Sequence, residues 1–320
     1  MQRVLLLLYH YMKVLILCSH RYYAPYTDYV APFIYEQMQN LKPLGCEFQV
    51  CFVRGGGLMS YLRALRSLKR QIDVFRPDLI HAHYGLCCLV ANMQRRIPVV
   101  STFHGSDINS PYVRPLSKIA MRLSAYNIFV SRALMDKAKG KSGKSAVVPC
   151  AVDTQSFRPM DRQACRRELG LSEDAAYVLF SKEFADKVKN APLAQAVVQQ
   201  LPQEKKVLLE FFGYTRRQVP LLYNAVDAAL LTSFSEGSPQ FVKEAVACGC
   251  PIVSTDVGDV REVMAGVPNA RICSYRSEDV LSKLQEVMSI GHLPHTCLPE
   301  CYTSQHVAKQ IYTIYQTLCK

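Results

Sequence analysis

The chain alternates short apolar segments with longer segments whose apolar residues recur every three or four positions. The short segments of its first half predict β-strands over 14–18, 48–53, 78–82, 98–102, 127–130 and 146–149. Two stripes between them predict amphipathic helices. They consist of Val30, Phe33, Ile34, Gln37, Met38 and Leu41, and of Leu58, Leu62, Leu65, Ile72 and Phe75. Strands and helices that alternate at this spacing favour a parallel sheet with helices on both faces.

The same alternation continues in the second half of the chain. Strands are predicted over 177–181, 206–211, 227–232 and 251–254, and short helices over 161–171 and after Asn190, which is expected to cap its helix. Apolar residues that begin at Val280 and at Val307 indicate two more helices. The pattern predicts an α/β chain with Rossmann-like sheets. No G-x-G-x-x-G follows the first strand, so NAD binding is disfavoured.

Composition narrows the class of protein. The 320 residues suggest about two domains, and 49% hydrophobic residues are ordinary for a globular protein. A formal net charge of +12 implies an anionic partner, such as a nucleotide diphosphate, a membrane surface or a nucleic acid. Nucleic acid comes last, because we find no RNA-binding aromatic motif and no basic segment interleaved with aromatic residues.

Cysteines and the N-terminus bear on the cellular compartment. The thirteen cysteines are scattered, and none forms a Cys-x-x-Cys pair. With an odd count and no visible secretory signal, we interpret them as reduced thiols of a cytoplasmic protein. The apolar run 4–8 is too short for an export or membrane segment. We therefore expect the natural chain to start at Met12, with residues 1–11 read from an upstream start codon.

The stretch 233–264 carries the strongest functional pattern. Glu236 follows the predicted strand 227–232, and Glu244 lies on the helix that comes next. Ser238 is expected to cap this helix, with Pro239 at its first position, and Gly249 suits a left-handed end. Ligands of parallel sheets bind at the carboxyl ends of the strands, which is where Glu236 would lie.

This arrangement suits a ligand that has both hydroxyls and phosphates. Each carboxylate can accept hydrogen bonds from two neighbouring hydroxyls, and the amides of Gly237, Ser238 and Phe241 can donate to anionic oxygens. A nucleotide sugar has both kinds of group. The alternative, for an isolated pair of glutamates at this spacing, is two solvated charges.

The whole block resembles the Glu-x7-Glu motif of retaining glycosyltransferases of family 4. The matching parts include the Gly-Ser-Pro turn at 237–239 and the Thr-Asp-Val-Gly-Asp segment at 255–259. The resemblance implies a GT-B fold, in which two Rossmann-like parallel-sheet domains face each other across a cleft. It also implies that Glu236 positions the donor sugar and that Glu244 contacts the ribose hydroxyls.

Histidines provide the second catalytic candidate. The segment 101–107 resembles the family's His-Gly-x-Asp segment near the reacting carbon, which makes His104 a catalytic candidate beside Glu236. His81 and His83 share one face of a strand end and could chelate a metal. No third ligand is evident, so we prefer a structural role for them.

The donor diphosphate needs positive charge. Lys189 stands just ahead of a predicted helix, where the family has a basic pair; Lys182 is the candidate for its partner and Lys187 the reserve. The turn 212–214 is expected to place Gly213 or Tyr214 against the nucleobase. The predicted donor-binding residues are therefore Glu244, Lys189, Lys182, Gly237, Ser238, Pro239, Gly213 and Tyr214.

We expect no metal and no other cofactor. The sequence contains no Asp-x-Asp, the motif that holds a metal-bound diphosphate in the other large glycosyltransferase fold. Lysines and a helix N-terminus would stabilise the charge on the leaving diphosphate instead. The donor is expected to be a UDP-, GDP- or ADP-sugar, and its base is not readable.

Two positions differ from the family pattern, and one segment resembles the family's link between its two domains. The loop His20-Arg21-Tyr22-Tyr23 lacks the family's glycine pair, and Ala151 stands where the family usually has glycine. The crossing around 148–159 divides the chain into an N-terminal acceptor domain, 1–155, and a donor domain, 156–300. Residues 301–320 are expected to form a helix that returns to the first domain.

The helix over 58–76 suggests a surface partner. Its only acidic residue is Asp73, whereas it carries five basic residues. These are Arg63, Arg66, Lys69, Arg70 and Arg76. Such a helix is either a solvated face or a contact with an anionic membrane, which would keep the enzyme peripheral at the inner face of the plasma membrane.

The resemblance implies a retaining, metal-independent glycosyltransferase. It would move a sugar from a nucleotide sugar to a saccharide or lipid-linked acceptor during synthesis of a bacterial surface polysaccharide, such as capsule or lipopolysaccharide. Two alternatives stay open. One is an inactive GT-B homologue that serves as a binding or partner subunit, and the other is a nucleotide-sugar epimerase on the same fold.

Overall fold

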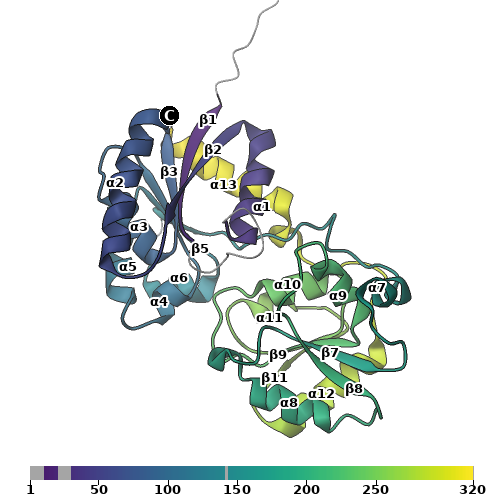
Figure 1. The fold of residues 1–320 in the computed structure, drawn as a ribbon. Helices are drawn as coiled ribbons and strands as arrows, with labels where there is room; N and C mark the ends of the chain where they lie inside the picture. Colours follow the sequence, from purple (N-terminus) through teal and green to yellow (C-terminus); the bar gives the residue numbers. More distant parts are fainter. Residues whose placement is uncertain (1–10, 21–29, 141–142, 320) are drawn as a thin grey trace, which may run out of the picture. The chain divides into compact units, whose positions relative to one another are not determined.

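The computed structural model describes residues 11–20, 30–140 and 143–319 (Figure 1). It divides into two compact units. Unit 1 comprises Met1–Phe129, Met135–Val148 and Ala308–Lys320, and unit 2 comprises Val130–Leu134 and Pro149–Val307. The expected start at Met12 concerns residues that are mostly outside the described ranges, as are residues 21–23 of the loop without a glycine pair. Within the described ranges, the helices are all too short or too polar to cross a membrane.

Unit 1 contains one parallel sheet with the strand order β2-β1-β3-β4-β5-β6. Its strands are β1 (Met12–Ser19), β2 (Cys46–Val53), β3 (Leu79–His83), β4 (Val99–Phe103), β5 (Tyr126–Phe129) and β6 (Ser145–Val147). Each overlaps a predicted strand. β3 and β4 are buried along their whole length, because helices cover both faces of the parallel sheet. Their sequences, LIHAH and VVSTF, therefore place polar side chains in the interior as well as apolar ones.

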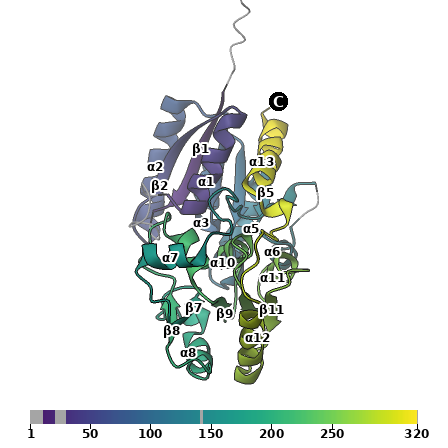
Figure 2. The ribbon, with the colours of Figure 1, turned by 90° about the vertical axis from the view of Figure 1, so that its right-hand side faces the viewer.

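Helices cover both faces of this sheet (Figures 1 and 2). One face carries α2 (Leu58–Phe75), α3 (Gly85–Asn92) and α5 (Arg114–Leu123), and the other carries α1 (Pro32–Leu41) and α13 (Ser304–Leu318). The short helices α4 (Ser106–Asn109) and α6 (Arg132–Ala138) complete this part of the chain.

One predicted helical stripe is wrong in detail. α2 buries Ser60, Ala64, Leu68 and Ile72, which recur every four residues, whereas Leu58 is 75% exposed. Of the predicted stripe, Ile72 is buried, and Leu65 and Phe75 are partly buried against the same core. The larger residues of the first turns are left in solvent.

Unit 2 contains a second parallel sheet with the order β11-β10-β9-β7-β8. Its strands are β7 (Ala176–Phe180), β8 (Lys206–Glu210), β9 (Ala228–Leu231), β10 (Ile252–Thr255) and β11 (Ala270–Cys273). Alternate residues of one strand enter different cores: Tyr177 and Leu179 pack on one face, and Val178 and Phe180 on the other.

The two cores of unit 2 lie under different helices (Figure 1). α8 (Ala191–Gln199) and α12 (Ser277–Ile290) cover one face of the sheet. α9 (Val219–Ala225), α10 (Gln240–Ala247) and α11 (Val260–Val263) cover the other, and α7 (Arg162–Leu169) packs on α9. Asp161 caps α7 by accepting from the amide of Ala164, and Gly170 ends it in the left-handed region, within the helix predicted over 161–171.

Both sheets have the same connectivity. The first strand of each unit, β1 or β7, lies between the second and the third, and the order continues outward from there. In such a sheet the chain leaves the carboxyl ends of the first and third strands in opposite directions, and a crevice opens between them. The predicted fold, two Rossmann-like parallel sheets in an α/β chain, is confirmed. The crevices expected to bind ligands lie between β1 and β3 and between β7 and β9.

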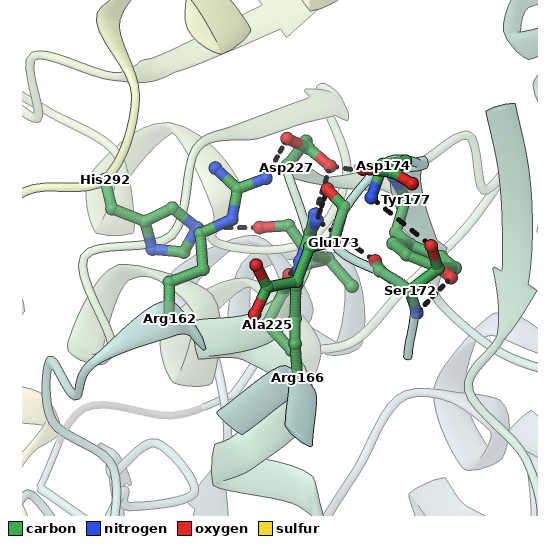
Figure 3. A network of polar contacts seen from close by, with 10 residues as sticks. Arg162, Arg166, Ser172, Glu173, Asp174, Tyr177, Ala225, Asp227 and His292 are labelled. Atoms are coloured by element: carbon green, nitrogen blue, oxygen red, sulfur yellow. Dashed lines mark hydrogen bonds and ion pairs between the residues drawn. The ribbon is translucent and has the colours of Figure 1, made fainter. Parts of the chain in front are cut away.

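A charged network braces the other edge of the second sheet, where the strands begin (Figure 3). Asp227 directly precedes β9 and accepts from Arg162, from Arg166 at 2.8 Å and from the amide of Tyr177 at 2.8 Å. Arg166 also donates to the Ala225 carbonyl at 2.8 Å. Nearby, the ring of His292 is 2.7 Å from the Val226 carbonyl, and burial lowers the pKa of this histidine. The network fixes α7 to the sheet.

The chain passes between the units at two neighbouring segments of unit 2. The amide of Val152 donates to the Tyr302 carbonyl at 2.9 Å, and the amide of Ser304 donates to the Val152 carbonyl at 3.1 Å. The units divide at Val148 and Pro149 and at Val307 and Ala308, whereas the sequence placed these boundaries at 155 and 300. α13 then packs in unit 1, where Tyr315 contacts His81.

Candidate functional site

The carboxyl edge of the second sheet gathers most of the predicted site residues. Lys182 follows β7, Lys189 precedes α8, Glu236 lies in the loop after β9, and Glu244 lies on α10. The topology therefore brings both carboxylates and both lysines to the edge at which β7 and β9 form the crevice.

Glu236 and Lys189 form an ion pair. The Lys189 ammonium donates to Oε1 of Glu236, and the two side chains are only 16% and 15% exposed. The Thr232 hydroxyl donates to the Lys189 carbonyl at 2.8 Å, which ties the start of α8 to the end of β9. Two residues that the sequence assigned to different parts of the ligand thus lie in direct contact.

Glu244 is held by two donors. Arg216 Nη1 lies 2.7 Å from Oε1 of Glu244, and the Tyr223 hydroxyl lies 3.1 Å from Oε2. The Arg216 guanidinium also stacks over the Phe157 ring at 4.4 Å from its centroid. Burial, followed by the charge of Glu244, raises the pKa of Tyr223 well above its ordinary value, so the phenol keeps its proton and donates it.

Arg216 is the site residue that sequence reasoning missed. It lies after β8 and just ahead of α9, at the same sheet edge as Lys189. The rule that selected Lys189, a cation just ahead of a helix N-terminus, applies equally to Arg216 and would have found it.

The predicted cap of α10 is wrong. The helix begins at Gln240, the residue at its N-cap position is Pro239, and no side chain caps it. Ser238 instead donates to Oδ2 of Asp259 at 2.6 Å. The buried Asp259 carboxylate needs hydrogen-bond donors. Because the Ser238 hydroxyl donates to it, this hydroxyl does not cap the helix. Burial raises the pKa of Asp259, although Lys243 and Ser238 act in the opposite direction.

Two loops approach each other closely beside Glu236. A Cβ on Gly258, whose φ is +64°, would lie 2.9 Å from the Gly237 carbonyl oxygen, so only glycine fits there. At the other end of α10, Gly249 has a φ of +66° and ends the helix as predicted. The Gly-Ser-Pro turn is therefore fixed by packing and by the Ser238–Asp259 hydrogen bond.

A buried lysine anchors α10 to the crossing segment. Lys243 has no exposed surface, and its ammonium donates to the Cys150 carbonyl and to the Gln240 side chain, each at 3.1 Å. The Gln240 side chain in turn donates to the Ala151 carbonyl at 2.8 Å. The helix that carries Glu244 is thus hydrogen-bonded to the segment where the chain enters unit 2.

The other residues predicted to bind the donor lie in the loops after β7 and β8. Lys182 pairs with Asp186 at 2.9 Å and is 46% exposed, and Lys187 is exposed. The Asp186 carbonyl in turn accepts from the Lys189 amide at 3.0 Å. Gly213 has a φ of +85° in the loop after β8. Tyr214 packs against the core under α9 and α10, and burial raises its pKa.

Unit 1 places His104 at the carboxyl edge of its own sheet, in a stack of three histidines. His83 Nδ1 lies 3.1 Å from His104 Nε2, and the His81 and His83 rings stack with centroids 4.4 Å apart. Both His81 nitrogens have partners, Tyr315 at 2.5 Å and Thr102 at 2.6 Å, as its preferred structural role requires.

Burial dominates the electrostatics of this stack. Together with the neighbouring His104 it lowers the pKa of His81 to about 3, and burial lowers that of His83 well below its ordinary value. The loop at His104 is held by Asp107, which accepts from the amides of His104 and Gly105 at 3.1 and 2.9 Å. In the part of the chain that the structure describes, no three His, Cys, Asp or Glu side chains are grouped to hold a metal ion.

Two parallel-sheet Rossmann-like units in one chain, the second with carboxylates and cations at its carboxyl edge, define the GT-B class of glycosyltransferase folds. The sequence gives the family. A model described as Glycosyltransferase Family 4 matches residues 29–156, and one described as Glycosyl transferases group 1 matches residues 184–289. The chain belongs to the family 4 glycosyltransferases.

A curated relative and two solved structures are similar over large parts of the chain. A Bacillus subtilis protein named for a teichuronic acid biosynthesis glycosyltransferase, TuaC, is 30% identical over 226 residues, which cover 62% of this chain and 57% of the relative. The chain therefore spans little more than half the length of this relative.

The solved structures match the fold. Sucrose-phosphate synthase from Thermosynechococcus elongatus has a TM-score of 0.77 and 13% identity, covering 96% of this chain and 99% of its own. Anabaena Alr3699/HepE in complex with UDP has a TM-score of 0.67 and 17% identity, covering 96% and 100%. At these identities the similarity concerns the fold alone.

Proposed function

We propose that this protein is a retaining, metal-independent glycosyltransferase that uses a nucleotide-sugar donor. The observation that carries the proposal is the pair of ionic contacts Glu236–Lys189 and Glu244–Arg216 at one sheet edge, in a chain of this family. Carboxylates suit the hydroxyls of sugar and ribose, and cations suit the diphosphate between them.

In the proposed reaction, each residue has a separate task. Glu244 accepts from the ribose hydroxyls, and Glu236 accepts from hydroxyls of the donor sugar and positions it. Lys189 and the amides of the Gly237–Ser238 turn stabilise charge on the leaving diphosphate, the electrostatic effect that usually contributes most to catalysis. Lys182 supplies a second, more exposed cation. His104 is assigned to the reacting carbon on the family resemblance alone.

The bond changes follow from retention of configuration. The bond between the anomeric carbon and a phosphate oxygen breaks, and the acceptor hydroxyl attacks on the face from which the diphosphate departs. The hydroxyl proton passes to the departing diphosphate, so no metal and no covalent enzyme intermediate is needed.

We further propose that the acceptor is a saccharide or lipid-linked molecule of bacterial surface polysaccharide synthesis, such as capsule or lipopolysaccharide. The similarity to a protein named for teichuronic acid synthesis supports this class. The exposed cations of α2 support a peripheral position at an anionic membrane, because the helix's acid, Asp73, already pairs with Arg96 at 2.8 Å.

A thermal-shift screen against UDP, GDP, ADP and their sugars, with and without EDTA, tests the donor site. A ligand at 100 times its dissociation constant should stabilise the protein by about 2.7 kcal/mol. We expect one nucleotide to shift the unfolding temperature, with the shift unchanged by EDTA. Glu244→Ala should weaken donor use by roughly 10- to 150-fold, because a hydrogen bond to a charged group contributes about 1.5 to 3 kcal/mol.

Other outcomes would change the proposal. No shift with any nucleotide would favour an inactive homologue, and a shift abolished by EDTA would contradict the metal-independent site. Product analysis with the nucleotide sugar that binds then separates transfer to an acceptor from isomerisation of the sugar.

A further inference from the structure

Arg216 and Tyr223 define how many hydrogen bonds Glu244 can accept from a ligand. An ionised carboxylate has two oxygens with about four acceptor sites in all. Arg216 occupies one site on Oε1, at 2.7 Å, and Tyr223 occupies one on Oε2, at 3.1 Å. One site then remains on each oxygen, which matches two neighbouring hydroxyls that each donate once.

Arg216 also supplies charge where Glu244 needs it. The Glu244 side chain is 4% exposed, and a buried carboxylate is costly to keep ionised without an opposite charge beside it. Stacking on the buried Phe157 ring fixes the guanidinium, so the cation is in place before any ligand arrives. A carboxylate held in a fixed orientation can make well-directed, charge-assisted hydrogen bonds to a ligand.

We propose that Arg216 is a specificity-determining residue of the donor site: it holds the Glu244 carboxylate in place, with a fixed positive charge beside it, so that the carboxylate requires both the 2′- and the 3′-hydroxyl of the donor's ribose. The inference rests on the proposed function, because it takes Glu244 as the ribose contact. It predicts that the protein discriminates strongly between ribonucleotides and 2′-deoxyribonucleotides, and that Arg216 is the source of this discrimination.

Calorimetric titrations with UDP and dUDP, GDP and dGDP, and ADP and dADP measure the effect. For the base that binds, the wild-type protein should prefer the ribonucleotide by roughly 10- to 150-fold, the range for a hydrogen bond to a charged group. In Arg216→Met the preference should fall to about 2- to 12-fold, the range for a hydrogen bond of ordinary strength, because the carboxylate is no longer held in place. The ratio is informative because a general loss of structure would weaken both ligands alike.

The chain offers a matched control in the next residue. Arg217 is exposed, and Arg217→Met removes the same charge from the same loop; its ribose preference should equal that of the wild type. In a Glu244→Gln background, Arg216→Met should change the preference no further, because Arg216 acts through the carboxylate. Tyr223→Phe, which removes the other donor to Glu244, should lower the preference in the same direction and provides a second variant should Arg216→Met not fold.

The outcomes separate the inference from the proposed function. If the wild type binds none of the six nucleotides, the proposed function fails. If it binds a ribonucleotide and Arg216→Met keeps the wild-type preference, or if Arg217→Met loses it equally, the role of Arg216 is overturned while the donor site stands.

Discussion

Four charged side chains of unit 2, three of them buried and Glu236 15% exposed, each have an opposite charge close by. Glu236 contacts Lys189, Glu244 contacts Arg216, Lys243 lies 3.9 Å from Asp259, and Arg166 contacts Asp227. A buried charge that loses its partner is expensive, so these residues are expected to tolerate removal of one member poorly. Three of the four pairs lie beside the carboxyl edge of the sheet. The fourth pair, Arg166–Asp227, lies at the opposite edge, where the strands begin. Removing it should therefore affect stability without affecting the donor site directly.

Asp227→Ala should destabilise unit 2 by about 3 to 5 kcal/mol, because Arg166, whose side chain is 5% exposed, would stay buried without a carboxylate. Urea unfolding followed by circular dichroism, with each transition fitted separately, measures this free energy. Asp256→Ala is the matched control, since its partner Arg261 is 70% exposed and the pair should contribute less than about 1 kcal/mol. Equal losses for both variants would show that the Asp227 network contributes no more than a surface pair.

The role of a residue was predictable where it depends on the local sequence. It was not predictable where a residue distant in sequence provides an alternative hydrogen-bond partner. The positions of Glu236, Glu244 and Lys189 follow from strand ends and helix starts, and the structure gathers all three at one edge. Ser238 was expected to cap α10, but Asp259, twenty-one residues further along, takes its hydroxyl. The contact between Arg216 and Glu244 joins the loop ahead of α9 to the second turn of α10, and the pairing has no signature in either segment alone.

At the scale of an element, α2 combines two features that suit a membrane surface. Its first turns expose Leu58, Met59 and Leu62, at 75%, 56% and 39%. The following turns expose four cations: Arg63, Arg66, Lys69 and Arg70. An interfacial helix has this combination of apolar side chains that can enter the headgroup region and basic ones that attract anionic lipids. The sequence indicated the cations, whereas the exposed apolar turn became evident only when the buried stripe was known.

Removing two of these cations should weaken binding to anionic vesicles. Each basic residue near an anionic surface contributes about 1 kcal/mol, so Arg66→Gln with Lys69→Gln should reduce partitioning roughly 30-fold. Co-sedimentation with vesicles of phosphatidylglycerol and phosphatidylcholine, compared with phosphatidylcholine alone, measures it. Arg261→Gln with Arg276→Gln removes two exposed cations from unit 2 as the control. Equal binding by both double variants would place the membrane contact elsewhere or show that there is none.

For the whole molecule, the fold was predictable because both sheets are parallel and covered on both faces. Such strands are recognisable as short, largely apolar segments, and β3, β4 and β7 are buried along their entire length. The contacts that fasten the end of the chain were not predictable. His81 and Tyr315 are 234 residues apart, and only the return of α13 to unit 1 brings them together. We expect this contact to make the attachment of the C-terminal helix sensitive to pH.

The pKa of His81 is lowered to about 3, from an ordinary value of 6.5, so unfolding the chain lets this histidine bind a proton that the folded state excludes. Stability should therefore be unaffected above about pH 7.5 and should fall between pH 6.5 and 3, by up to about 1.4 kcal/mol per pH unit for each such histidine. His83 acts in the same direction, whereas Asp107, whose pKa is raised by burial, opposes them at low pH.

Comparing variants isolates the contribution of His81 from those of His83 and Asp107. His81→Gln can still accept from Tyr315 or donate to Thr102 but cannot titrate, so its stability should fall less steeply between pH 6.5 and 5 than that of the wild type, by about 1 kcal/mol per pH unit on average. Urea unfolding of both proteins at pH 7.5, 6.5, 5.75 and 5 gives the slopes, and His295→Gln, at an exposed position, serves as the control. Parallel slopes for the wild type and His81→Gln would mean that His81 is protonated in the folded protein, and that its contacts with Tyr315 and Thr102 persist with the ring charged.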